Sequence, residues 1–60
     1  MKKFYRVSAF RVWNEFNNYD DAEKRFNELV NSGNYGYVEF AEIEQTETYQ
    51  HGSSIKIFSK

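Results

Sequence analysis

The chain has sixty residues, which is enough for one small domain with a modest core. It has no cysteine, no proline and one histidine, so the sequence excludes disulfides and a thiolate metal site. The formal net charge of −1 excludes a polyanion binder held by bulk charge alone. No apolar run reaches the length of about 20 residues that a membrane span requires, and no signal core follows the N-terminus. We therefore expect a single cytoplasmic domain over residues 1–60.

The first predicted element is a β-strand from Lys3 to about Trp13. This stretch is rich in Phe, Tyr, Val and Trp, with charged residues between them, which is typical of strands. A polar connection covers residues 14–18 and leads to the next element.

A short helix is predicted over Asp21–Asn31. Asp20 is a suitable N-cap, and Glu23 stands three residues later in an acidic variant of the capping box. Gly33 follows at a plausible C-cap position. Apolar residues at helical spacing form one stripe, which we expect to face the core: Ala22, Phe26, Leu29 and Val30.

Two further strands are predicted, over residues 37–49 and 54–59, with a turn at residues 50–53 in which Gly52 supplies a positive φ. The predicted fold is therefore α+β, a single β-α-β-β domain with a three-stranded, mainly antiparallel sheet and one helix packed on one face. We place the last strand at the centre, antiparallel to both others. In the alternative, the first and second strands lie side by side in parallel.

Alternation along these strands predicts apolar side chains on both faces of the sheet. The helix is expected to cover the face that carries Val7, Ala9, Ala41, Ile43, Ile55 and Ile57. The opposite face would then expose Phe4, Phe10, Val12, Val38, Phe40 and Phe58. Such a patch exceeds what monomers usually leave exposed, so we expect a homodimer or a different protein to cover it. The alternative is a β-bulge near Ala9–Phe10 and another near Phe40–Ala41, which would move every large side chain into one core.

Other candidate contact residues belong to types that are frequent at interface hot spots. These are Arg11, Trp13, Tyr37 and Tyr49. Glu42 and Glu44 complete the set, because acids along the second predicted strand can imitate a phosphate track. In the alternative, they pair with the basic first strand, since residues 1–12 carry four basic residues and no acid.

We expect no catalytic, cofactor-binding or metal-binding residues, and hence no enzyme. His51 stands in a predicted turn near Ser53, Ser54 and Glu47, where no cleft is expected to bring a catalytic set together. Basic residues alternate with aromatic ones in the stretch 3–6, as in modules that stack single-stranded bases. A single-stranded nucleic-acid or nucleotide binder is therefore an alternative.

The order of elements, the helix start Asp20-Asp21-Ala22-Glu23 and the chain length resemble the small β-α-β-β proteins encoded by phages and prophages. Many of these are accessory proteins that disable a host system, anti-CRISPR proteins among them. The resemblance implies a cytoplasmic, non-enzymatic inhibitor that occupies a surface of a host protein, and it assigns no residue a role. A structural homodimer or subunit is the remaining alternative.

Overall fold

The segment predicted as one long strand folds back on itself. In the computed structural model, which describes residues 2–60, β1 (Lys2–Ala9) and β2 (Val12–Phe16) form an antiparallel hairpin. Phe10 and Arg11 join them, and Arg11 has φ 62°. This left-handed conformation is costly for a residue with a side chain, yet it is where the chain reverses. The prediction of a single strand over residues 3–13 is therefore wrong.

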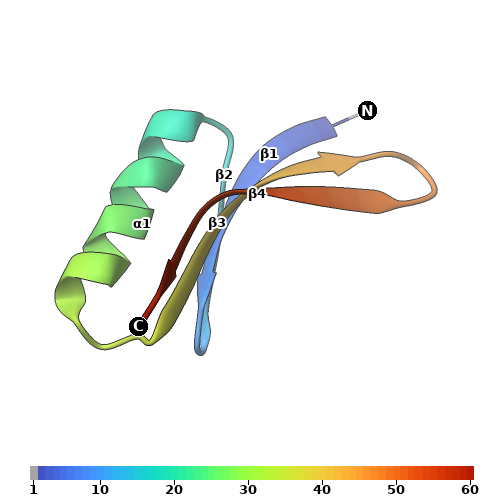
Figure 1. Cartoon of the computed structure of the whole chain (residues 1–60). Helices are drawn as coiled ribbons and strands as arrows, with labels where there is room; N and C mark the ends of the chain where they lie inside the picture. Colours follow the sequence, from blue (N-terminus) through green and yellow to red (C-terminus); the bar gives the residue numbers. More distant parts are fainter. Residues whose placement is uncertain (1) are drawn as a thin grey trace.

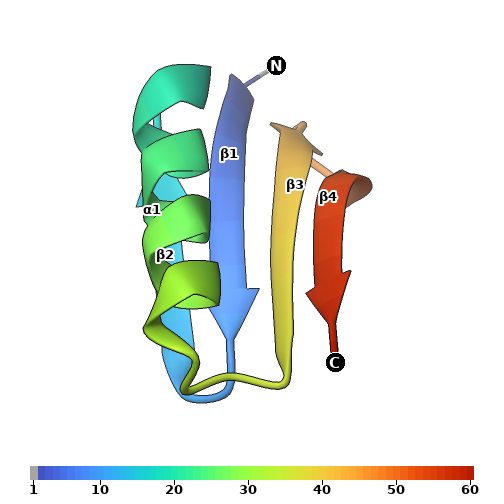
Figure 2. The same ribbon diagram turned by 60° about the vertical axis from the view of Figure 1, so that its left-hand side comes forward.

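The sheet has four antiparallel strands in the order β2-β1-β3-β4, with β3 spanning Tyr37–Gln45 and β4 spanning Gln50–Ser59 (Figures 1 and 2). The α+β class and the single helix on one face are confirmed. The expected three strands are corrected to four, because the early hairpin adds one. That hairpin also alters the order, since β1 pairs with β3 in antiparallel fashion and β4 lies at an edge rather than at the centre.

The helix α1 (Tyr19–Ser32) begins two residues earlier than predicted, because Asn18 rather than Asp20 is its N-cap. The Asn18 side chain accepts a hydrogen bond from the backbone N–H of Asp21 and donates one to its carboxylate, each at 2.9 Å. At the other end, the predicted C-cap is confirmed: Gly33 has φ 74° and its N–H bonds to Val30. The predicted apolar stripe is also confirmed, with Ala22, Phe26 and Leu29 buried.

The main core lies between α1 and the sheet. Val7, Val38 and Phe40 are fully buried there against the helix stripe. Register explains this, because Val7 pairs with Phe40 and Ala9 pairs with Val38, and paired residues share a face. Val12 and Phe58 pack at the margin of the same cluster. The prediction that Val12, Val38, Phe40 and Phe58 face away from the helix is therefore wrong.

A second, smaller cluster lies on the side of the sheet opposite α1, which we call the open face. It consists of Phe4, Ala41 and Ile43, of which the last two were expected beneath the helix. The β3–β4 hairpin bends away from α1 (Figure 1), and long polar side chains replace a helix as cover. The Lys2 ammonium, for example, lies 5.7 Å from the centre of the Phe4 ring.

A β-bulge interrupts the pairing of β3 with β4. Phe40 pairs with Lys56 while Ala41 pairs with Ser54, so Ile55 is the extra residue. The bulge expected near Phe40–Ala41 is therefore present, although β4 carries it. The predicted turn at residues 50–53 is wrong, because Thr46–Tyr49 makes the turn and residues 50–53 belong to β4.

Candidate protein-interaction surface

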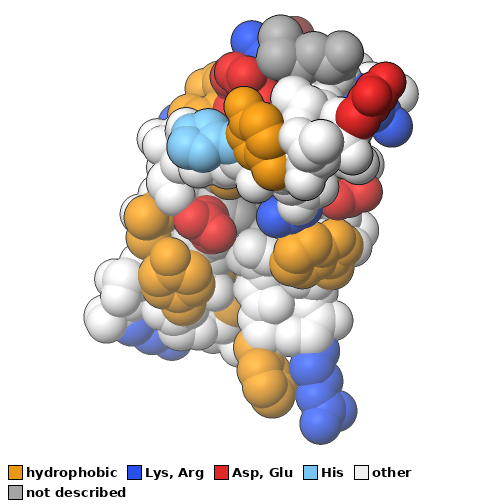
Figure 3. Space-filling view, turned by 90° about the vertical axis from the view of Figure 1, so that its right-hand side faces the viewer, with side chains coloured by type: hydrophobic (Ala, Val, Ile, Leu, Met, Phe, Trp, Pro, Cys, Tyr) orange, Lys and Arg blue, Asp and Glu red, His pale blue; other side chains and the backbone are white. Residues whose placement is uncertain are grey.

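Pairing across the four strands arranges the open face in transverse rows. Trp13 pairs with Ser8, Ser8 with Glu39, and Glu39 with Ile57. We call this the Trp13–Ile57 row. It starts and ends with an exposed apolar side chain, since Trp13 is 62 % and Ile57 53 % exposed. Figure 3, which views the side opposite α1, shows hydrophobic side chains in separate patches between polar and charged ones.

Arg6 holds Trp13 in place from the neighbouring strand. Its guanidinium carbon lies 4.1 Å from the centre of the Trp13 ring. The same guanidinium donates a hydrogen bond to the side chain of Gln50 at 3.1 Å and lies 3.5 Å from the Glu15 carboxylate. Only 17 % of the Arg6 side chain is exposed. An arginine that Gln50 and Glu15 hold from two sides orients the tryptophan ring, while most of the ring stays exposed.

More aromatic surface gathers at the end of the sheet where the β1–β2 turn lies. Phe10 is 77 % exposed, and the Arg11 guanidinium carbon lies 5.4 Å from the centre of its ring. Tyr37 reaches the same end, because the next residue in β3 pairs with Ala9, and it is half-exposed. We call Phe10, Arg11, Trp13 and Tyr37 together the aromatic end. Hydrophobic and basic side chains project together at the lower tip of Figure 3, where this turn lies.

The other predicted contact residues lie elsewhere. Phe4, Val38 and Phe40 are buried within the chain, so the prediction that they form an exposed contact surface is wrong. Val12 and Phe58 are half-buried in the α1 core. The three remaining residues lie away from the aromatic end. Glu42 forms an ion pair with Lys3 at 3.5 Å. Glu44 pairs with His51 across β3 and β4, and Tyr49 lies in the β3–β4 turn.

Sequence reasoning missed two residues of the open face. Ile57 was expected beneath the helix, and Arg6 was considered as a partner of acids across the sheet and of nucleic acid, but not as a contact residue for a protein. No local pattern reveals that Trp13 lies beside Arg6, which depends on the β1–β2 hairpin, or that Ile57 lies on the open face, which depends on the pairing of β4 with β3.

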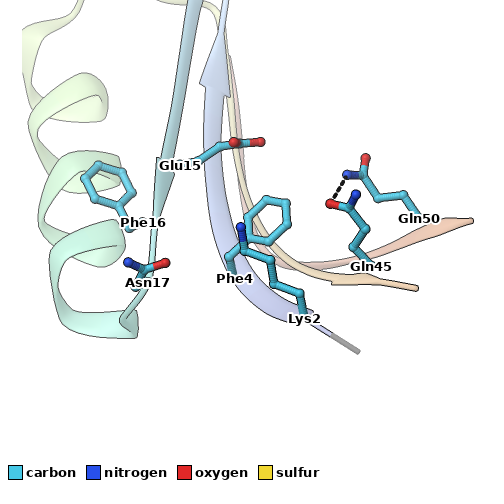
Figure 4. A pocket seen from close by; sticks show the side chains of 7 residues that line it. All are labelled: Lys2, Phe4, Glu15, Phe16, Asn17, Gln45 and Gln50. Atoms are coloured by element: carbon cyan, nitrogen blue, oxygen red, sulfur yellow. Dashed lines mark hydrogen bonds between the residues drawn. The ribbon is translucent and has the colours of Figure 1, made fainter. Parts of the chain in front are cut away.

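A pocket of about 240 Å³ lies at the end of the open face remote from the β1–β2 turn (Figure 4). Its lining is mostly polar and comes from β1, β2, β3, β4 and the connection to α1: Lys2, Phe4, Glu15, Phe16, Asn17, Gln45 and Gln50. Pockets that bind small molecules usually measure about 300–1,000 Å³ and have apolar walls. The Glu15 carboxylate lies beside Arg6, and nothing in the lining forms a pair of acid and base within hydrogen-bond reach of each other. We assign no chemistry to this pocket.

The shortest ion pair among residues 2–60 lies on the other side of the sheet and ties α1 to β4. The Lys56 ammonium donates a hydrogen bond to the Glu23 carboxylate at 2.7 Å. This bond lowers the pKa of Glu23 and raises the pKa of Lys56. Both side chains are partly exposed, so the pair anchors the helix rather than forming a reactive centre.

Residues 2–60 contain no helix with the length and hydrophobicity that a membrane crossing requires. Within the same range, histidines and acidic residues do not gather in threes as metal ligands do.

No protein-family model matches the sequence, and the searches of curated proteins and of solved structures gave no match.

Proposed function

We propose that the chain is a non-enzymatic binding protein, encoded by a phage or another mobile element, that inhibits a host protein by covering part of its surface. The observation that carries the proposal is the state of Trp13, whose ring is largely exposed and yet held by Arg6 at 4.1 Å. Folding alone does not require this arrangement, because burial of the ring would stabilise the domain more than exposure does.

The aromatic end has the composition of a binding hot spot. Trp, Tyr and Arg are the residue types that contribute most to interface energies, and Trp13, Tyr37 and Arg11 supply one of each beside the exposed Phe10. A side chain that is already ordered loses less conformational entropy on binding than a mobile one. The β-sheet and Arg6 therefore prepare Trp13 for contact with a partner.

The chain is large enough for this role. A standard interface buries about 800 Å² on each partner, which is about a fifth of this chain's accessible surface of 4296 Å². The aromatic end and the Trp13–Ile57 row extend over all four strands. A small domain of this kind acts by steric occlusion, since it needs only to occupy a surface that its partner uses.

The nucleic-acid alternative would use the same arginine–aromatic pairs. Carboxylates on the open face argue against it, because Glu39 lies in the middle of the Trp13–Ile57 row and Glu15 lies beside Arg6. A phosphate backbone laid across this face would meet both negative charges. The geometry therefore favours a protein partner.

The test compares two variants with the wild type in the same assay. Tagged wild-type protein, the double variant Phe10→Ala/Trp13→Ala, and the single variant Tyr49→Ala are used to capture proteins from a bacterial lysate. Tyr49 is as exposed as Trp13 but lies in the β3–β4 turn. Captured proteins are identified by mass spectrometry, purified and titrated. We expect one host protein that the wild type and Tyr49→Ala bind and inhibit alike, and that the double variant binds about 30-fold or more weakly.

Two results would overturn this proposal. One is a set of captured proteins that does not differ between the double variant and the wild type. The other is retention on single-stranded DNA that falls steeply with salt and needs no protein partner.

A further inference from the structure

β4 presents a long free edge. It spans ten residues, all exposed except the half-buried Phe58. At about 3.3 Å per residue, this edge approaches the 37 Å length of the molecule. Among residues 2–60, no strand lies beside its outer backbone groups, since β4 is the last strand of the sheet.

The usual protection of edge strands is scarce in β4. Natural edges carry lysines, prolines, inward-pointing charges or bulges, which prevent pairing with other chains. The chain contains no proline. Lys56 is the one lysine in β4, and it points inward to Glu23 of α1 rather than projecting from the edge. This inward charge and the bulge at Ile55 are the protection that β4 has.

That bulge divides the edge into two parts of different character. Residues 50–54 are polar or glycine. Residues 55–59 include Ile55 and Ile57, which are both exposed. The part beyond the bulge is therefore a regular, largely apolar edge without a free charge.

We propose that residues 55–59 of β4 pair in antiparallel fashion with the same residues of a second copy of this chain, around a two-fold axis at Ile57. This register brings Ile57 against Ile57 of the second copy and Lys56 against its Phe58. The ladder is limited to this segment, because the bulge at Ile55 ends it on one side and Ser59, the last residue of β4, ends it on the other. Only the register centred on Ile57 pairs all five residues of this segment with the same five residues of the second copy.

Charge and symmetry favour a second copy as the occupant. The two lysines stand opposite phenylalanines rather than each other, so like charges do not face across the ladder. An antiparallel pair of identical edges is isologous, which is the commonest way in which homodimers close. The pairing joins the two sheets into one, and the Trp13–Ile57 row continues across the axis. Trp13, on the outer strand β2, and the β1–β2 turn of each copy then lie at the far sides of the joined sheet, where they remain free to bind the partner proposed above.

A short strand pair is a small interface, so we expect dimerisation to depend on concentration. Sedimentation equilibrium of the full chain from about 1 μM to about 1 mM should show the mass rising from that of a monomer to that of a dimer. Ile57→Lys places two positive charges at the axis and should weaken the dimer by about tenfold or more. Trp13→Lys is the control, because it also introduces a lysine at an exposed apolar position, at the other end of the same row.

Disulfide formation supplies a second measurement that does not depend on a loss of association. The chain has no cysteine, so Ile57→Cys introduces a single thiol at the proposed axis. Mild oxidation should link two copies of Ile57→Cys rapidly, whereas Trp13→Cys should remain mostly monomeric. A wild type that stays monomeric to about 1 mM would overturn the proposal, and so would equal dimerisation of Ile57→Lys. Equal cross-linking of the two cysteine variants would place the contact elsewhere.

Discussion

The guanidinium carbon of Arg6 lies 4.1 Å from the centre of the Trp13 ring, across the β1–β2 pair on the open face. The two residues come from adjacent strands. The direct cross-strand partner of Arg6 is Glu15, and that of Trp13 is Ser8. The contact is therefore a diagonal one, of the kind that long and aromatic side chains make across a sheet. It gives the chain's only tryptophan a fixed position on an exposed surface.

This contact predicts a fluorescence change in Arg6→Lys. Lysine keeps the charge but lacks the planar group that stacks on the ring, so Trp13 should become more mobile. We expect lower fluorescence anisotropy, stronger quenching by acrylamide, and a loss of about 1 kcal/mol in the free energy of unfolding. Arg11→Lys, whose guanidinium lies against Phe10 instead, should leave the tryptophan signal unchanged. An unchanged signal in Arg6→Lys would show that the stack does not order the ring.

Phe40 should be the most sensitive position in the core. Its fully buried ring contacts the rings of Tyr5, Tyr19 and Phe26, with centroids 5.1 to 6.2 Å away. Phe40→Ala should cost about 3–5 kcal/mol, which is enough to unfold a domain of this size. The equally apolar change Phe10→Ala should alter stability by less than about 0.5 kcal/mol. Urea denaturation followed by circular dichroism measures both, and similar losses would contradict the core described above.

The helix cap offers a test of which residue starts α1. Asn18 bonds to Asp21 through both its oxygen and its nitrogen. Asn18→Ala should therefore lower the free energy of unfolding by about 1 kcal/mol. Asp20→Ala removes a charge from the first turn but no cap, so its cost should be about half of that or less. A larger loss in Asp20→Ala, measured in the same urea titration, would return the cap to the position predicted from sequence.

Gly52 and Ile43 should be energetically coupled. A Cβ atom at position 52 would lie 3.0 Å from Cδ1 of Ile43, which is itself buried in the second cluster. Gly52→Ala should cost about 1 kcal/mol through this overlap. In an Ile43→Val background, which lacks that methyl group, the same change should be neutral or favourable, because glycine weakens a strand. A double-mutant cycle measures the coupling, and strictly additive effects would contradict it.

The Glu23–Lys56 pair predicts a defined pH window. The bond to Lys56 lowers the pKa of Glu23. Ionised Glu23 therefore stabilises the fold above pH 4.5, the ordinary pKa, and this stabilisation is lost as pH falls through the lowered pKa. The same bond raises the pKa of Lys56. Charged Lys56 therefore stabilises the fold below pH 10.5, the ordinary pKa, and this stabilisation is lost as pH rises through the raised pKa. The pair therefore stabilises the fold between these limits.

Glu23→Gln should reduce the melting temperature slightly near neutral pH, and the difference from wild type should shrink at both extremes. High salt should also reduce it, since the pair is partly exposed. Glu28→Gln, an exposed acid on the same helix, is the control that should show no such profile. A constant difference at every pH would mean that the ion pair does not act.

The sequence by itself determined the elements that depend on local chemistry. The apolar stripe of α1, its glycine C-cap and the strand character of residues 37–45 follow from periodicity and residue type, and they are confirmed. The α+β class follows from the same signals. The aromatic residues at the exposed end were also among the candidates named in advance, because Trp, Tyr and Arg stand out by type alone.

Only the tertiary structure decided which side chains share a face. The reversal at Phe10–Arg11 contains no glycine, proline or asparagine. Arg11 nevertheless adopts a left-handed conformation, because the reversal lets β1 pair with β2 on one side and with β3 on the other. That one reversal adds a strand and changes the strand order, so that register, rather than local propensity, places Val38 and Phe40 beneath the helix. The bulge at Ile55 acts in the same way on β4. Strand pairing is a long-range interaction between segments distant in sequence, and a shift of a single residue exchanges core and surface.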